Sequence, residues 1–274
     1  AGFAYISLGP ALMSVPESYA LIPQVLQDTD ISFFCAEMAT KENGADLAAI
    51  RACAQIIHDL APMDPNGFQN LYFTALANSP PGSPFFPASY HKGGAPAFAF
   101  ATEAASLAVD AFSGAPSLEE GVQRLITAME EVGSKLDMVG EKLSEAFDFD
   151  YLGIDLSLAP YPADHSSLGH AMEQVGVPRV GQHGSLAVAA LLADAIDKAD
   201  FKRTGFSGLL LPPLEDSALA ARGADGSLTV KDLLMYSAVC GTGLDTVPLP
   251  GDTKPEEMTP LLLDLSALAL RLDK

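Results

Sequence analysis

The segment at residues 240–253, CGTGLDTVPLPGDT, combines a thiol with two carboxylates, three glycines and two prolines. Cys240 ends an amphipathic helical pattern, and Gly241 suits the left-handed residue that follows a helix. The negative end of a helix dipole disfavours a thiolate. Cys240 is therefore expected to act as a hydrogen-bond donor or as a nucleophile, and its protonation state stays open. Asp245 follows apolar residues where an unpaired carboxylate is costly, which makes it a candidate general base. Asp252 fits helix capping as well as ligand binding.

Two further segments carry candidate polar groups. In RVGQHGSLAVAALL, residues 179–192, His183 stands between glycines before a helical pattern, where free backbone N–H groups favour an anion. His183 could polarise a carbonyl or bind a carboxylate, and a helix start with an adventitious histidine fits equally well. In GIDLSLAP, residues 153–160, Asp155 interrupts an apolar strand pattern. Ligands gather at the carboxyl ends of parallel strands, so Asp155 is a candidate general base or metal ligand.

Several polar residues follow other predicted strands. His91 lies in a loop at residues 77–96 that is rich in proline and glycine, and Glu103 follows an aromatic strand pattern. Either side chain could reach a pocket, although an exposed loop histidine more often has no role. Glu215 and Asp216 follow the apolar run LLLPP and could bind a metal ion or cap the next helix.

A divalent ion is one possible cofactor, although the sequence leaves the cofactor open. Carboxylate oxygens suit Mg²⁺ or Ca²⁺, and the candidate ligands are Asp155, Asp245, Asp252 and Glu215. The patterns G-x-x-x-x-G-K-[ST], G-x-G-x-x-G, H-E-x-x-H and G-x-S-x-G do not occur. A phosphate-binding loop and a serine-hydrolase elbow therefore have no support in the sequence.

Composition restricts the partners. The 35 acidic and 15 basic side chains give a formal charge of −20, which repels nucleic acid and anionic lipid surfaces. No apolar run approaches the roughly 20 residues that cross a bilayer, and the first residues do not show a basic segment followed by an apolar one. Its three cysteines are too widely spaced for a disulfide framework or a zinc ribbon. We expect a cytoplasmic protein with a small-molecule ligand, without nucleic-acid or membrane partners, and, by base rate, a homodimer.

Strand and helix patterns alternate along the chain, as parallel β/α units do. Strands are predicted at residues 3–8, 31–38, 70–77, 95–101, 151–158, 208–212 and 244–249. Helices are predicted at residues 44–61, 117–147, 166–175, 184–199 and 229–240, with a last one from near Thr253. Ser117 with Glu120, and Thr229 with Asp232, have the spacing of helix N-caps. The fold class is therefore α/β, as one domain over residues 1–274, and a barrel or a doubly wound sheet fits.

Four motifs in this order resemble the domain of unknown function 711, also called the pyruvate formate-lyase-like family. They are LANSPPGSPFFPASYHKGG, GIDLSLAP, GQHGSLA and SAVCGTGLDTVPLPGDT. The resemblance implies a single ten-stranded β/α barrel with an inner loop, for which CGTGLDTVPLP is the candidate. Cys240 would then take the place of a radical-bearing cysteine, but the C-terminal R-V-x-G-Y type motif of glycyl radical enzymes does not occur. The resemblance also implies that the chain is incomplete at both ends.

These residues and the family resemblance suggest three alternative functions. The first is a small-molecule enzyme with its pocket at the barrel mouth, of unknown reaction, using Cys240, Asp245, His183, Asp155 and His91. The second is a non-catalytic metabolite-binding or assembly protein on the same fold. The third is a metal-dependent hydrolase or lyase that uses the four carboxylates named above.

Overall fold

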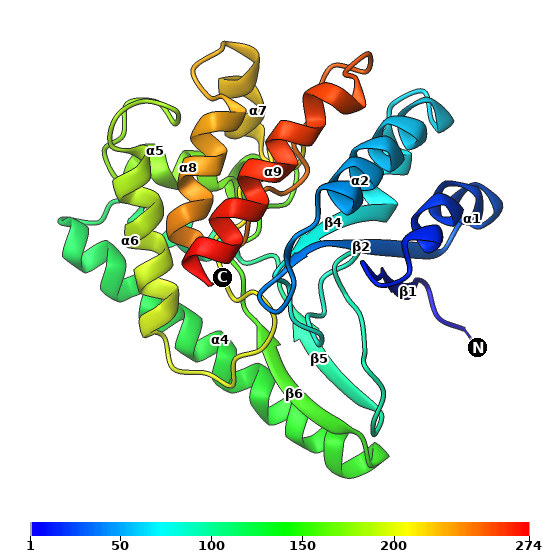
Figure 1. The fold of residues 1–274 in the computed structure, drawn as a ribbon. Coiled ribbons are helices and arrows are strands. Elements are labelled where there is room, and N and C mark those ends of the chain that lie inside the picture. Colours follow the sequence, from blue (N-terminus) through cyan, green and yellow to red (C-terminus); the bar gives the residue numbers. More distant parts are fainter. Residues whose placement is uncertain (1, 274) are drawn as a thin grey trace. The chain divides into compact units, whose positions relative to one another are not determined.

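The computed structural model describes residues 2–273 (Figure 1). The chain divides into two compact units. Unit 1 comprises residues up to 93 together with those from 249 onward, and unit 2 comprises residues 94–248. Each unit has its own hydrophobic core, so the two are described separately.

Unit 1 is built on a four-stranded sheet. Its strands are β1 (Ile6–Ala11), β2 (Ser32–Thr40), β3 (Gly44–Ala45) and β4 (Phe73–Ala77). Strand β2 pairs in parallel with β1 and with β4, and it pairs in antiparallel fashion with the short β3. The parallel pairs confirm the strand–helix alternation that the sequence predicts for this half of the chain.

The helices of unit 1 are α1 (Ile22–Asp28), α2 (Leu47–Leu60) and α9 (Pro255–Leu272), with 3-10 turns at Pro16–Leu21, Ala61–Met63 and Phe68–Tyr72. Asp46 caps α2, since its Oδ1 accepts from the backbone N–H groups of Ala48 and Ala49 at 2.7 and 3.0 Å. Met38 of β2 and Ile50 of α2 are fully buried in the core between sheet and helices. Figure 1 shows α1 and α2 on the same side of β2.

Unit 2 contains a two-stranded parallel sheet and six helices within the described residues. Its elements are β5 (Ala97–Ala101), α3 (Ala105–Phe112), α4 (Leu118–Phe147), β6 (Asp150–Asp155), a 3-10 turn at Asp164–Ser166, α5 (Leu168–Gln174), α6 (Ser185–Lys198), α7 (Ser217–Ala224) and α8 (Val230–Cys240). Beyond β6, single bridges join Ile154 to Arg203 and Leu158 to Leu209. An extended segment at residues 203–210 therefore runs beside the end of β6.

Helix α4 shows how local sequence fixes an element. Ser117 caps it as predicted, because its Oγ accepts from the N–H of Glu120 at 3.2 Å. Leu125 and Met129 on its inner face are fully buried. At Gly140, a Cβ would lie 2.4 Å from Cζ of Tyr151, so glycine is needed for the tyrosine ring to pack against the helix.

The α/β class is confirmed, whereas the barrel stays a prediction because no closed barrel is found among residues 2–273. The strand predicted at 208–212 has only the bridge at Leu209. The strand predicted at 244–249 is wrong: these residues form no strand, and Thr246 has a φ of 33°. Pro248 and Pro250 lack the N–H that a sheet requires. Helix α9 begins at Pro255, capped by Lys254 rather than Thr253.

The longest helices do not have the character of membrane spans. Helix α4 carries charged side chains along its length, as does the start of α9. Within residues 2–273, no helix combines the length and the apolar character that crossing a bilayer requires.

Candidate functional site

The turn at residues 240–247, after α8, is held against the extended segment beside β6. Gly241 has a φ of 74°, the left-handed conformation expected after a helix. The Thr242 hydroxyl donates to the Leu209 carbonyl at 2.7 Å, and Cys240 Sγ lies 3.2 Å from the same hydroxyl oxygen. Because the single hydroxyl proton is already given to Leu209, the thiol is the donor to Thr242.

This turn faces the interior of unit 2. Cys240, Leu244 and Val247 are half-buried and pack against the unit's core. The Leu214 backbone N–H donates to the Thr246 carbonyl at 3.3 Å, which ties the turn to the segment before α7. The turn is thus built into unit 2, and its assignment as the inner loop of a barrel stays a prediction.

Asp245 carries the carboxyl of this turn, and its pKa is strongly shifted. Burial, and then the negative charge of Glu215, raise the pKa of Asp245 to about 7. The pKa of Glu215 is itself raised, first by burial and then by Glu103. Glu103 follows β5, Glu215 precedes α7, and Asp245 lies in the turn after α8. The three carboxyls belong to one electrostatically coupled group, which we call the acid group.

Asp155 lies elsewhere in unit 2 and is fully buried at the end of β6. Its carboxylate accepts from the backbone N–H of Phe206 at 2.6 Å, the N–H of Ser207 at 2.8 Å and the Ser157 hydroxyl at 2.6 Å. Burial raises its pKa, and these three hydrogen bonds oppose the shift. We interpret Asp155 as an anchor that joins β6 to the 203–210 segment.

The remaining predicted site residues are exposed. His183 precedes α6 on the surface of unit 2, and no described interaction joins it to the acid group. The glycine before it has a packing role, because a Cβ at Gly181 would lie 1.8 Å from the Ser227 carbonyl oxygen. In unit 1, His91 Nδ1 accepts from the Gly93 N–H at 3.1 Å within its own loop, and Asp252 is exposed ahead of α9.

The structure does not assemble the predicted metal ligands. Within residues 2–273, no three His, Cys, Asp or Glu side chains are grouped closely enough to hold a metal ion. Asp155 directs its oxygens to backbone N–H groups, and Asp245 is coupled electrostatically to Glu215. Asp216, next to Glu215, caps α7 by accepting from Ala218 and Leu219 N–H, which confirms its capping interpretation.

Sequence reasoning left two contributors out of the candidate site. Glu103 was considered as a side chain that could reach a pocket but was not assigned to the site, because its coupling to Glu215 depends on the fold. Thr242 was not considered, although its place between two glycines in CGTG favours a turn whose hydroxyl reaches a neighbouring chain segment.

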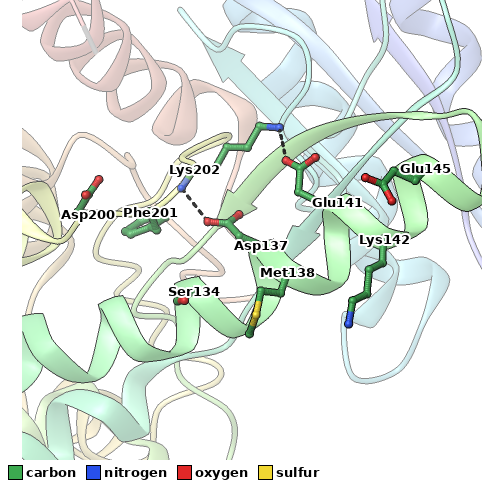
Figure 2. A pocket seen from close by; sticks show the side chains of 9 residues that line it. All are labelled: Ser134, Asp137, Met138, Glu141, Lys142, Glu145, Asp200, Phe201 and Lys202. Carbon is green, nitrogen blue, oxygen red and sulfur yellow. Dashed lines mark hydrogen bonds and ion pairs between the residues drawn. The ribbon is translucent and has the colours of Figure 1, made fainter.

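A groove of about 690 Å³ lies apart from these residues, along α4 and the chain at residues 200–202 (Figure 2). Two of its acidic side chains, Asp137 and Glu141, interact with Lys202. Lys202 Nζ lies 3.2 Å from Glu141 Oε1, and the Lys202 backbone N–H donates to Asp137 at 3.2 Å. The groove contains none of the predicted site residues, so we do not assign the site to it.

Comparison with known proteins identifies the family. Residues 4–274 match the family model described as "Uncharacterised ACR (DUF711)". A UPF0210 protein of Pyrobaculum islandicum is 31% identical over 270 residues, covering 92% of this chain and 57% of the relative. Similar proteins from Pyrobaculum aerophilum and Lactobacillus delbrueckii subsp. bulgaricus are 32% and 28% identical, covering 86% and 91% of this chain.

The chain spans 57%, 54% and 57% of the length of these three relatives, respectively. The predicted relation to pyruvate formate-lyase and the predicted additional terminal segments are not tested by these matches and stay predictions. The match over nearly the whole chain, together with the identity to these relatives, shows that the chain belongs to the DUF711 family, whose members are also named UPF0210 proteins.

Proposed function

We propose that this chain performs proton-transfer chemistry on a small molecule, with Asp245 as the general base. The observation that carries the proposal is the pKa of Asp245, which burial and Glu215 raise to about 7. A carboxyl that titrates near neutral pH can both accept and return a proton under cellular conditions, which is the property that general acid–base catalysis needs. Strongly perturbed carboxyls concentrate at functional sites.

The neighbours of Asp245 have distinct roles in this proposal. The charges of Glu215 and Glu103 keep the acid group from losing all its protons at once, so one proton remains available near pH 7. Cys240 supplies an S–H donor beside Thr242 in this proposal. His183, His91 and Asp155 have no assigned step.

The setting of the site follows from the same proposal. The turn at residues 240–247 would form the inner loop at the mouth of a β/α barrel, as the resemblance implies. The net charge of −20 supports a small-molecule ligand rather than nucleic acid as the partner. A cytoplasmic homo-oligomer is part of the proposal by base rate alone.

The experiment is a turnover screen of the purified protein against a metabolite extract, read by mass spectrometry. The wild type should convert a component at a rate that rises with pH through about 7, because the base acts in its ionised form. Asp245→Asn should lower that rate by about 10²- to 10⁴-fold, since it removes the base.

Asp252→Asn is the matched control, because Asp252 is an exposed carboxylate in the neighbouring segment. It should leave the rate within about twofold, as surface substitutions away from a site generally do. Full activity in Asp245→Asn, or a rate that is flat across pH 6 to 8, would reject the proposal. A metabolite that binds at Asp245 without conversion would select the non-catalytic metabolite-binding alternative.

A further inference from the structure

The groove along α4 follows one face of that helix. Its lining residues on α4 are Ser134, Asp137, Met138, Glu141, Lys142 and Glu145. Their spacing of three and four positions places them on a single helix face, which is about 16 Å long from the first to the last. The chain at residues 200–202 forms the opposite side (Figure 2). The groove is therefore elongated and runs along the helix.

Side-chain contacts hold the two sides of the groove together. Asp137 accepts from the Tyr151 hydroxyl at 2.7 Å and from the Lys202 backbone N–H at 3.2 Å. Lys202 Nζ lies over the Tyr151 ring, 4.6 Å from its centroid. A Cβ at Gly133 would lie 2.7 Å from Cβ of Phe201, so glycine at this position lets Phe201 pack against α4. The shape of the groove is thus preformed, which lowers the ordering cost of binding.

Apolar side chains lie in the middle of the groove. Met138 is 57% exposed, and Phe201 on the opposite side is half-buried. Figure 2 shows Met138 between Asp200 and Glu145. Exposed apolar surface with a charged rim is typical of interaction sites, and a methionine side chain adapts to the shape of a partner.

Three charged side chains of the groove have no ion pair or side-chain hydrogen bond within residues 2–273. They are Lys142, Glu145 and Asp200, none of which carries a dashed line in Figure 2. The Asp200 backbone N–H donates to Glu130 of α4 at 3.3 Å, which places Asp200 beside that turn of the helix. Glu145 lies about 22 Å further along the helix axis than Glu130. The two unpaired carboxylates therefore stand near opposite ends of the groove.

We infer that this groove docks a basic amphipathic helix of a partner protein. Lysine or arginine side chains at the two ends of the partner helix pair with Asp200 and Glu145, and an apolar side chain between them packs on Met138. One acidic side chain of the partner pairs with Lys142. A helix of about 16 residues spans the distance between the two carboxylates, whereas a short diamine reaches only one of them.

The charge of the whole chain agrees with this partner. The formal charge of −20 attracts basic segments and speeds their encounter with the groove. The acid group of the proposed function contributes no residue to the groove, so the inference goes beyond that function.

The test uses a fluorescent helical peptide of about 16 residues, matched to the groove in length. It carries lysines in its first and last turns, leucine in its middle and one glutamate placed to face Lys142. Fluorescence anisotropy with the full chain should show saturable binding. Glu145→Gln combined with Asp200→Asn should weaken binding at least tenfold. Both positions are exposed, so the core is untouched, and each single variant should weaken binding about threefold if the double variant does not fold.

Met138→Glu separates docking in the groove from general attraction to an acidic chain. It removes the apolar contact but adds a negative charge, so docking predicts at least fivefold weaker binding, whereas general attraction predicts stronger binding. Lys142→Gln should weaken binding of this peptide and leave unchanged the binding of a peptide with glutamine in place of the glutamate.

Glu119→Gln combined with Glu131→Gln is the matched control, because both are exposed carboxylates of α4 outside the groove. This double variant should bind within twofold of the wild type. Equal losses in the two double variants, stronger binding by Met138→Glu, or no saturable binding would overturn the inference. Saturable binding of spermidine but not of the peptide would also overturn it, in favour of a small polyamine. Asp245→Asn should retain peptide binding, which separates this result from the fate of the proposed function.

Discussion

Two carboxylates of unit 2 differ in how the protein surrounds them. Asp155 is fully buried, yet it accepts three hydrogen bonds from Ser157, Phe206 and Ser207. Asp245 is half-buried and faces the like charge of Glu215. The consequence of burial therefore differs between the two carboxylates. At Asp155, the hydrogen-bond donors stabilise a carboxylate that connects two chain segments. At Asp245, the neighbouring acid raises the pKa, so that this group titrates near neutral pH.

The largest expected effect on the free energy of unfolding follows from replacing Asp155. Asp155→Ala leaves two backbone N–H groups and one hydroxyl without an acceptor in the core, so we expect it to lower the free energy of unfolding by about 4 kcal/mol. Urea unfolding at pH 7 measures this. Asp155→Asn keeps one acceptor oxygen and should cost about half as much, and an unchanged unfolding midpoint in both variants would remove the distinction between the two carboxylates.

Replacing Asp245 is expected to raise the free energy of unfolding, by less than the loss expected at Asp155. Its folded pKa is about 7, above the unfolded value, so its contribution to stability is complete below about pH 4 and is lost as pH rises through about 7. Asp245→Asn removes this dependence and should be more stable than the wild type by roughly 2–4 kcal/mol at pH 8. Unfolding free energies measured from pH 4 to 8 check the sign, and a parallel pH dependence in the wild type and Asp245→Asn would contradict it. The exposed Asp252→Asn should keep the wild-type pH dependence.

The smallest effect on the free energy of unfolding is expected at Thr242, in the turn that carries Asp245. Thr242→Val deprives the Leu209 carbonyl of its donor and the Cys240 thiol of its acceptor, while it keeps the shape of the side chain. We expect a loss of about 1–2 kcal/mol in the free energy of unfolding. Thr242→Ser retains the hydroxyl and should recover most of this loss. A neutral Thr242→Val would mean that packing alone holds the turn.

Elements with local signals were predictable from the sequence. Ser117 and Thr229 begin α4 and α8 as their spacing to Glu120 and Asp232 indicates, because a cap is formed by residues three positions apart. The strand predicted near Asp245 failed because its apolar run was weighed above its prolines.

The candidate site was only partly predictable. Asp155 and Asp245 both stand beside apolar residues, and the sequence gives them the same role. The groups that separate them are distant: Phe206 lies 51 positions after Asp155, and Glu215 precedes Asp245 by an entire helix–turn–helix segment. A carboxylate's neighbours in space decide its protonation, and they come from chain segments that only the fold brings together.

The placement of the three cysteines makes the turn at Cys240 a site for selective chemical labelling. Cys35 and Cys53 are buried, and burial raises the pKa of each thiol to about 12, so neither presents a reactive thiolate near neutral pH. Cys240 is only half-buried. An alkylating fluorophore should therefore label the unmodified wild-type chain at this single position and report directly on ligands that reach the turn.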